Sequence, residues 1–185
     1  ASRSSSGFEL RVHPTLVAHN HMLAAVDREM NAGLLKADLL GPLLISGAGA
    51  GPGPTASSVL SDVADCVRAL GNDWEPTLTP LEGLGSDEST ELPVIEVGKI
   101  ESAYYFRVNT VDEPGILASI TKVLAASEIS IEAIVQHEDR EAGGLVPIVI
   151  ITEKVMEEKA CLAADVISKM EGVRGSVKRF RVQKP

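Results

Sequence analysis

The segment Asp112-Glu113-Pro114-Gly115-Ile116-Leu117 marks the change from one hydrophobic period to another in this chain of 185 residues. Before it, Tyr104, Phe106 and Val108 occupy alternate positions, which is the period of a β-strand. After it, apolar residues recur at helical spacing as far as Leu124. Proline fixes φ and glycine tolerates unusual backbone angles, so the segment predicts a strand, a tight turn and a helix in that order.

The sequence beyond this helix predicts four more elements, three strands and one helix. Apolar residues alternate again over 129–135, and the continuously apolar run 146–151 is typical of a central strand. A second helix is predicted at 156–170 and a last strand at 177–182. The order βαββαβ predicts a ferredoxin-like α+β domain over 102–185, with a four-stranded antiparallel sheet and both helices on one face.

The composition upstream of this domain divides the chain further. From 73 to 101 the sequence is rich in Pro, Gly, Ser, Thr and acidic residues, so we expect an interdomain linker. Residues 1–7 are small and polar without periodicity and are interpreted as another linker. The remaining segment, 8–72, is too small to enclose a core alone, and we expect it to be a piece of a larger α/β domain.

Within that segment the pattern predicts strands, a hairpin and one helix. Alternation over 8–12 predicts a strand, and a hairpin turning near Gly41 would lead into a second strand at 42–46. Apolar residues at helical spacing predict a helix over about 56–70, with Thr55 as its cap.

Between this strand and this helix stands Gly47-Ala48-Gly49-Ala50-Gly51-Pro52-Gly53-Pro54. Glycine has no Cβ, so a backbone rich in glycine can be approached closely by a ligand or by another chain segment. An unusually flexible turn would explain the same residues, and only the neighbouring Pro54, Thr55 and Ala56 favour a ligand-facing loop.

Charge and composition exclude several classes of partner. The net charge of -9 and the pI near 4.9 argue against nucleic acid and anionic membranes, which would repel the chain. No stretch approaches the roughly 18 consecutive apolar residues that a membrane span needs. Cys66 and Cys161 fall in apolar helical patterns, so we expect two reduced core residues in a cytoplasmic protein. His19 and His21 have no third ligand at suitable spacing, and no metal is assigned.

The turn at Asp112 and the strand that begins Ile129-Ser130-Ile131-Glu132 resemble the ACT family, and the resemblance covers 102–182. It implies a regulatory domain that pairs its sheet with that of a second subunit and binds a small amino acid near the turn. Free N–H groups at a helix start suit the carboxylate of such a ligand. The implied effector residues are Asp112, Glu113, Pro114, Gly115, Ile116 and Gln136.

The upstream segment resembles the closing part of the catalytic domain of homoserine dehydrogenases, a family that often carries an ACT domain after such a linker. The resemblance lies in Arg11-Val12-His13-Pro14-Thr15-Leu16, in Asn31-Ala32, and in the glycine loop with Pro54-Thr55-Ala56-Ser57 and Asp62. The Pro147 inside the apolar strand 146–150 is similar to that family's own ACT domain.

This second resemblance implies NAD(P)-dependent interconversion of L-aspartate 4-semialdehyde and L-homoserine, with threonine as the first candidate for the effector, another amino acid being left open, and a homodimer or larger homo-oligomer. The implied cofactor contacts are Gly47, Gly49, Ala50, Gly51 and Thr55. The dinucleotide fingerprint and the family's catalytic lysines belong upstream, so no catalytic residue is assigned and the chain alone is expected to be inactive. NAD and NADP are not distinguished, because the residues that read the ribose are not in this sequence.

Two hypotheses of different classes follow from the sequence. In the first, the chain is part of a homoserine dehydrogenase whose ACT domain couples an amino-acid level to activity. In the second, it is a non-catalytic ACT sensor or dimerisation module, and the upstream segment is a docking arm. The basic residues Lys178, Arg179 and Arg181 are interpreted under either hypothesis as a solvated edge or a dimer contact.

Overall fold

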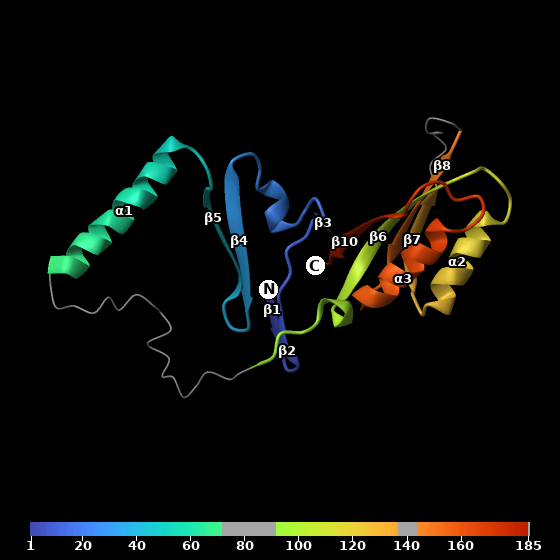
Figure 1. Cartoon of the computed structure of the whole chain (residues 1–185), viewed down its shortest axis with the longest axis horizontal. Coiled ribbons are helices and arrows are strands. Elements are labelled where there is room, and N and C mark those ends of the chain that lie inside the picture. The colour runs from blue at the N-terminus through green and yellow to red at the C-terminus, as the bar shows by residue number, and fades with distance from the viewer. Residues whose placement is uncertain (72–91, 137–143, 185) are drawn as a thin grey trace. The chain divides into compact units, whose positions relative to one another are not determined.

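The structure of the chain is a computed structural model, which describes residues 1–71, 92–136 and 144–184 (Figure 1). It divides into two compact units, one formed by residues 1–18 and 92–185 and the other by residues 19–91. Residues 8–18, which we predicted to belong to the segment 8–72, and the predicted linker 1–7 therefore both group with the C-terminal part of the chain. Most of the predicted linker 73–101 lies outside the described residues.

The first unit is built on the predicted order of strands and helices. In chain order its main elements are β6 (Glu101–Thr110), α2 (Ile116–Ala126), β7 (Ile131–Gln136), β8 (Val146–Thr152), α3 (Glu157–Ser168) and β10 (Lys178–Gln183). The strands lie in the order β10-β6-β8-β7, and each neighbouring pair is antiparallel. The ferredoxin-like α+β fold expected from the sequence is thereby confirmed.

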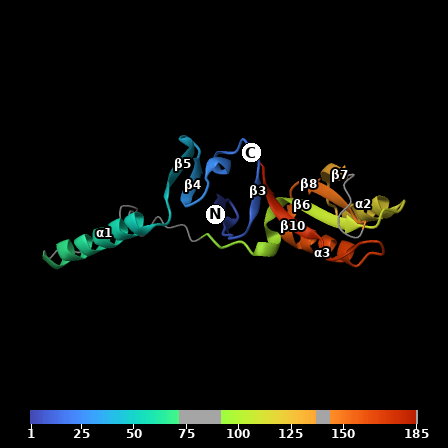
Figure 2. The same cartoon turned by 90° about the horizontal axis from the view of Figure 1, so that it is seen from above.

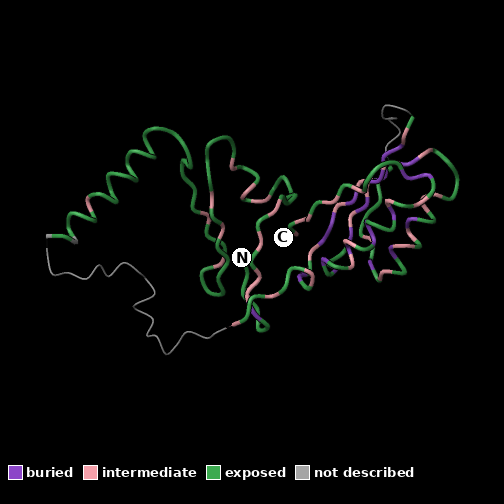
Figure 3. Tube along the Cα trace, viewed as in Figure 1, coloured by how far each residue is buried: buried purple, intermediate pink, exposed green. Residues whose placement is uncertain are grey.

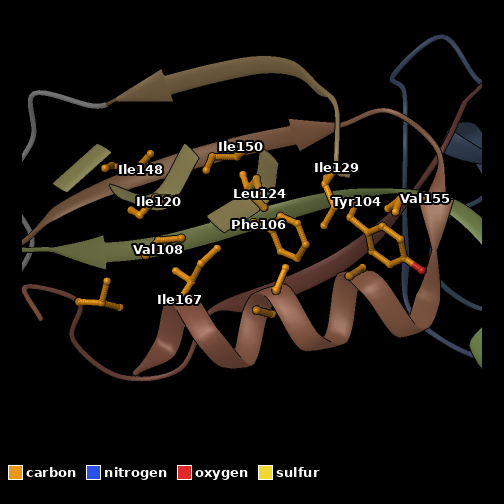
Figure 4. Packing of buried hydrophobic residues seen from close by; sticks show 14 residues of the cluster. Tyr104, Phe106, Val108, Ile120, Leu124, Ile129, Ile148, Ile150, Val155 and Ile167 are labelled. Atoms are coloured by element: carbon orange, nitrogen blue, oxygen red, sulfur yellow. The ribbon is translucent and has the colours of Figure 1, made fainter. Parts of the chain in front are cut away.

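Both helices pack on one face of this sheet. Side chains at alternate positions of β6, namely Tyr104, Phe106 and Val108, point from the sheet toward α3 (Figure 4). They share a single buried cluster with Ile120 of α2 and Ile167 of α3, and all five residues are fully buried. Because alternate residues of a strand face opposite sides, a cluster that joins these residues to both helices places the helices on the same side.

The opposite face of the sheet carries no helix among the described residues of this unit and is largely apolar, although Arg107 and Lys178 also lie on it. Cross-strand neighbours Phe180 and Tyr105 pack edge to face, with ring centroids 6.2 Å apart. Val149 and Ile151 of β8 lie on this face, and Val135 of β7 pairs with Val149 there. Phe180 and Val135 remain 40% and 46% exposed. Exposed apolar side chains grouped in this way are typical of a face that packs against another protein surface.

Two short segments extend the sheet in ways that the sequence did not predict. β3 (Thr15–Val17) pairs in parallel with β10, and β9 (Val155–Met156) pairs with the start of β6. β10 therefore has neighbours on both sides and is not an edge strand, contrary to the interpretation of its basic residues.

The extreme N-terminus is also more ordered than expected. β1 (Ser2–Ser4) and β2 (Gly7–Glu9) form a small antiparallel hairpin, so the interpretation of residues 1–7 as a linker is wrong in its local structure. The strand predicted over 8–12 ends at Glu9. Phe8 exchanges backbone hydrogen bonds of 2.9 Å with Pro93 and Ile95, whereas Val12 is fully exposed and has no neighbouring strand to pair with among the described residues.

The second unit contains a hairpin and a helix. A 3-10 turn (Met22–Ala25) leads into β4 (Met30–Ala37), which pairs with β5 (Gly41–Ala48) in a regular antiparallel register. The predicted hairpin near Gly41 is confirmed, and that glycine has the left-handed φ of 72° that the tight turn requires.

α1 (Pro52–Gly71) follows the hairpin, and its apolar side chains are uncovered in this chain. Val59, Leu60, Val63 and Val67 are each more than half exposed, and Cys66 on the same helix is exposed rather than in a core as predicted. No described side chain between residues 19 and 71 is buried, and this part of Figure 3 accordingly shows only the colours of exposed and intermediate residues. The expectation that this segment cannot enclose a core by itself is confirmed.

The length of α1 does not make it a membrane helix. Neither α1 nor any other helix in the described part of the chain combines enough length with enough apolar character to cross a bilayer.

Candidate functional site

The predicted cofactor loop lies where β5 passes into α1. Gly47 is still in β5, and Gly49, Ala50 and Gly51 form the connection to Pro52, the first residue of the helix. A Cβ at Gly47 would meet no atom within 4 Å, and Gly51 has a φ of 118°, which side chains rarely tolerate. All the predicted cofactor residues, including Thr55, are exposed. The backbone here is open to close approach.

The start of α1 differs from the prediction. Thr55 is not the cap but lies in the first turn, where its N–H donates to the carbonyl of Gly51 at 3.2 Å. The helix can begin at Pro52 because the first-turn N–H groups have no helical partner, so Pro52 and Pro54 lose nothing there. The proline-rich stretch that read as a loop is therefore the beginning of the helix.

The same two prolines limit what this helix start can bind. Of residues 52–54, only Gly53 has an N–H group to offer to a ligand. A helix start that cradles phosphate uses several such groups together. The loop is therefore better suited to a neutral, flat group than to a pyrophosphate.

The predicted effector turn lies at the start of α2. Gly115 is the residue before the helix and has a left-handed φ of 93°. Asp112, Glu113 and Pro114 are exposed on this turn, and Ile116 is half-buried. The first N–H groups of α2 have no partner within the helix, so they are available to a carboxylate on this side.

A glycine that was not singled out in the sequence packs against this turn and bonds to it. Gly172, which follows α3, accepts a hydrogen bond of 2.8 Å from the N–H of Val111. Its φ is 84°, and a Cβ at this position would lie 2.6 Å from Cδ1 of Ile116. The sequence signal was the glycine soon after the second helical pattern, where a left-handed residue commonly ends a helix.

Gln136, the sixth predicted effector residue, lies at the same end of the sheet but not beside the turn. β6 and β7 run in the same direction on either side of β8, with Thr110 opposite Val146 and Gln136 opposite Ile148. Two strand spacings of about 4.8 Å each therefore separate the ends of β6 and β7. Within this chain, the structure groups the residues of the turn and leaves Gln136 on the far side of β8.

A buried ionic network, also missed from the sequence, ties α3 to the sheet. Glu157 is 5% exposed and accepts hydrogen bonds from the hydroxyl of Tyr104 at 2.7 Å and from Nε of Arg181 at 2.8 Å. Arg179 approaches the other carboxylate oxygen at 3.1 Å. The interpretation of Arg179 and Arg181 as a solvated edge is therefore wrong: their side chains are 24% and 18% exposed and compensate a buried charge.

This network sets the ionisation of its members. Burial alone would raise the pKa of Glu157, but the hydrogen bonds from Tyr104 and Arg181 and the two positive charges hold that pKa below its usual value. Burial, and then the hydrogen bond to Glu157, raises the pKa of Tyr104, so its hydroxyl remains a donor. Burial, followed by the charges of Arg181 and Arg11, lowers the pKa of His13.

The remaining titratable side chains suggest neither a metal centre nor a disulfide. Among the described residues, no three His, Cys, Asp or Glu side chains are grouped closely enough to hold a metal ion. Cys66 and Cys161 are both free thiols, and Cys161 is partly buried against Arg179.

Comparison with known protein families gives two matches, in the order expected from the sequence. Residues 2–64 match the family described as homoserine dehydrogenase, and residues 104–160 match the ACT domain. The first match includes β4, β5 and most of α1, and the second runs from β6 into α3.

Individual relatives match along almost the whole chain. The homoserine dehydrogenase of Pseudomonas aeruginosa is 42% identical over 183 residues, which are 99% of this chain and 42% of that protein. The homoserine dehydrogenase of Neisseria gonorrhoeae is 35% identical over 98% of this chain and 41% of its own length. A solved homoserine dehydrogenase from Thiobacillus denitrificans superimposes with a TM-score of 0.79 at 38% identity, covering 98% of this chain and 40% of the other. The chain thus spans about two fifths of the length of the relatives it matches.

Proposed function

The chain belongs to the homoserine dehydrogenase family, and from that premise we propose that it forms part of an enzyme that interconverts L-aspartate 4-semialdehyde and L-homoserine with NAD or NADP. The observation that carries the proposal is the alignment of a homoserine dehydrogenase with 99% of the chain, across both matched segments. A non-catalytic sensor with a docking arm is not favoured, because the supposed arm itself matches the catalytic family.

In this proposal the glycine loop faces the nicotinamide end of the dinucleotide, which supplies or accepts the hydride. The exposed backbone of Gly47 and Gly51 allows a flat ring to approach without obstruction by side chains, whereas the side chain of Asn31 lies against Gly49 between them. The shortage of N–H groups at the prolines of α1 argues against the pyrophosphate as the group bound here. The contribution of this chain is therefore alignment of the reacting groups, with Ala50 and Thr55 at the edge of the same loop.

A hybrid enzyme tests this function. The chain would be joined to the N-terminal part of the P. aeruginosa relative, in place of that protein's own matching segment. We expect homoserine-dependent reduction of NAD or NADP by the hybrid, followed as absorbance of the reduced nicotinamide. A folded hybrid that binds the dinucleotide but does not oxidise homoserine would contradict the proposal.

The unit formed by residues 1–18 and 92–185 contains the match to the ACT domain and is called the ACT unit below; for it we propose binding of a small amino acid, threonine, at the turn that opens α2. The ligand's carboxylate would meet the free N–H groups at Ile116 and its neighbours, and Asp112 would face its ammonium group. Since β8 separates Gln136 from this turn, Gln136 would complete the site from a second subunit. Coupling of such a site to activity is typically about 1 to 3 kcal/mol.

We propose that the second subunit packs against the helix-free face of the sheet in the ACT unit. This face presents Phe180, Tyr105, Val149 and Val135, and no helix in the described part of the same unit covers it. A homodimer through this face would bury these side chains and bring two turns and two β7 strands into one assembly. We propose a cytoplasmic location, because nicotinamide cofactor and free amino acids are both available there.

A further inference from the structure

The glycines near the end of the hairpin are not all explained by backbone shape. Gly33, Gly47 and Gly49 do not have the positive φ that requires glycine, and glycine in a strand is unfavourable compared with a residue that has a side chain. A Cβ at Gly33 or at Gly47 would meet no atom within 4 Å. Gly49 is different, because its missing Cβ has a definite neighbour.

That neighbour is the carboxamide of Asn31. A Cβ built on Gly49 would lie 1.9 Å from Nδ2 and 2.3 Å from Cγ of Asn31, so no other residue fits at position 49 while Asn31 keeps its place. Asn31 pairs across the hairpin with Gly47, whose lack of a side chain leaves the carboxamide free to lean toward Gly49. The N–H of Gly49 donates to the carbonyl of Glu29 at 2.8 Å and holds the chain beside β4 at this point.

Asn31 is itself an unusual residue for this position. Asparagine is disfavoured in strands. Because Asn31 is exposed, no burial of its side chain offsets this unfavourable strand propensity. Within the described part of the chain, no hydrogen bond to its carboxamide accompanies the contact with Gly49. Local choices that oppose the secondary structure are expected where function requires them.

We propose that Asn31 is a positioning residue for the glycine loop: its carboxamide, packed on Gly49, fixes the path by which the chain leaves β5 toward α1. The proposal rests on the proposed function, since it concerns the loop that would meet the nicotinamide end of the dinucleotide. It assigns the glycine at 49 to a contact within the chain, and leaves Gly47 and Gly51 as the places of closest ligand approach.

The test is a double-mutant cycle in the hybrid enzyme with Asn31→Ala, Gly49→Ala and the double variant. Gly33→Ala is the matched control, because it adds a methyl group to the same hairpin in open space. Two readouts are needed: KM for the dinucleotide against kcat, and hydrogen exchange of the backbone over 46–53.

We expect Asn31→Ala to raise the KM for the dinucleotide by about tenfold, equivalent to about 1.4 kcal/mol, and to speed exchange in 46–53. Gly49→Ala should be worse, because its methyl group and the carboxamide compete for one space. In the double variant the exchange rate and KM should return to the level of Asn31→Ala alone. Asn31→Asp, which keeps the shape, should retain slow exchange.

Two results would overturn the proposal. One is an Asn31→Ala variant with unchanged exchange and unchanged KM. The other is a double variant as defective as Gly49→Ala, which would mean that the glycine serves the ligand or another segment directly. If the unmodified hybrid does not oxidise homoserine, the proposed function fails, and hydrogen exchange in the same four proteins still decides whether Asn31 positions the loop.

Discussion

At the scale of single residues, Glu157 is the centre of the buried ionic network in the described part of the ACT unit. It stands at the first position of α3 and receives Tyr104 from β6 and two arginines from β10. A buried carboxylate is stable only when it is paired and hydrogen-bonded in this way. One residue therefore joins a helix to two strands that are far apart in the sequence.

Replacement of this carboxylate should destabilise the unit. We expect Glu157→Gln to lower the free energy of unfolding by roughly 1–3 kcal/mol, because it removes the negative charge that compensates the two arginines and replaces one of the two acceptor oxygens by an NH2 donor. Glu158→Gln is the control, since Glu158 is the next residue of the same helical turn and is exposed. Urea unfolding followed by circular dichroism measures both, and equal losses in the two variants would contradict the role of the network.

The same residue predicts a pH dependence. The pKa of Glu157 is lowered from the ordinary glutamate value of 4.5, so the unfolded chain binds the proton more readily than the folded chain does. The stability from this group is complete above pH 4.5 and is lost as the pH falls through the lower, folded value. Stability should therefore fall more steeply with acid in the unmodified chain than in Glu157→Gln. Parallel curves of unfolding midpoint against pH would refute this.

At the scale of elements, the turns depend on glycines to different degrees. Gly98 has an ordinary φ, and a Cβ there would make a normal contact at 3.7 Å with Glu158. Gly115 has a left-handed φ but open space around it, and Gly172 has both a left-handed φ and a clash with Ile116. The three positions form a graded series.

Alanine substitutions should follow this order. Gly98→Ala should be close to neutral, and Gly115→Ala should cost roughly 1–2 kcal/mol from the left-handed backbone alone. Gly172→Ala should cost more than Gly115→Ala, because Ile116 must also move. Thermal unfolding midpoints check the order. A Gly172→Ala variant as stable as Gly98→Ala would show that the close packing of Gly172 on Ile116 does not constrain the turn.

The elements also show which parts of the fold local pattern can predict. The order βαββαβ followed from periodicity, because strand and helix each impose their own spacing on apolar residues. The strand β3 did not, since Thr15–Val17 is short and its partner β10 lies at the other end of the chain. The start of α1 was placed too late because prolines were taken to interrupt a helix that they begin.

Pattern also assigned some side chains to the wrong face or environment. An irregularity in register between Ile131 and Ala133 leaves Ala133 and Val135 on the helix-free face, although simple alternation from Ile129 would bury them. Arg179 and Arg181 were predicted to be solvent-exposed because nothing in the sequence of α3 indicates that its Glu157 pairs with them. Long-range pairs of this kind are fixed by the tertiary fold and leave no local signal.

At the scale of the whole molecule, the two units differ in how they are stabilised. The ACT unit has a continuous core, whereas the described part of residues 19–71 has none and exposes the apolar side of α1 (Figure 2 gives a second view of these elements). Under the proposed function, the apolar side chains of α1 pack against parts of the enzyme that precede this segment. The chain spans 42% of the length of its P. aeruginosa relative.

Association of the ACT units is the corresponding prediction at this scale. Phe180→Glu places a charge on the helix-free face and should convert a dimer into a monomer in sedimentation velocity, since burial of an unpaired charge is unfavourable. Leu162→Glu is the control, because Leu162 is 58% exposed on α3, away from that face. Dissociation by Leu162→Glu and not by Phe180→Glu would move the interface to the helices.

The most direct test of the central claim, that this chain carries an amino-acid sensor, is calorimetric titration with threonine at near-physiological salt. Serine, methionine and isoleucine serve as controls in separate titrations of the same protein. The account predicts saturable binding of threonine alone, abolished when Ile116→Pro removes an N–H from the turn at the start of α2. Heat indistinguishable from dilution with threonine, or equal binding of all four amino acids, would contradict it.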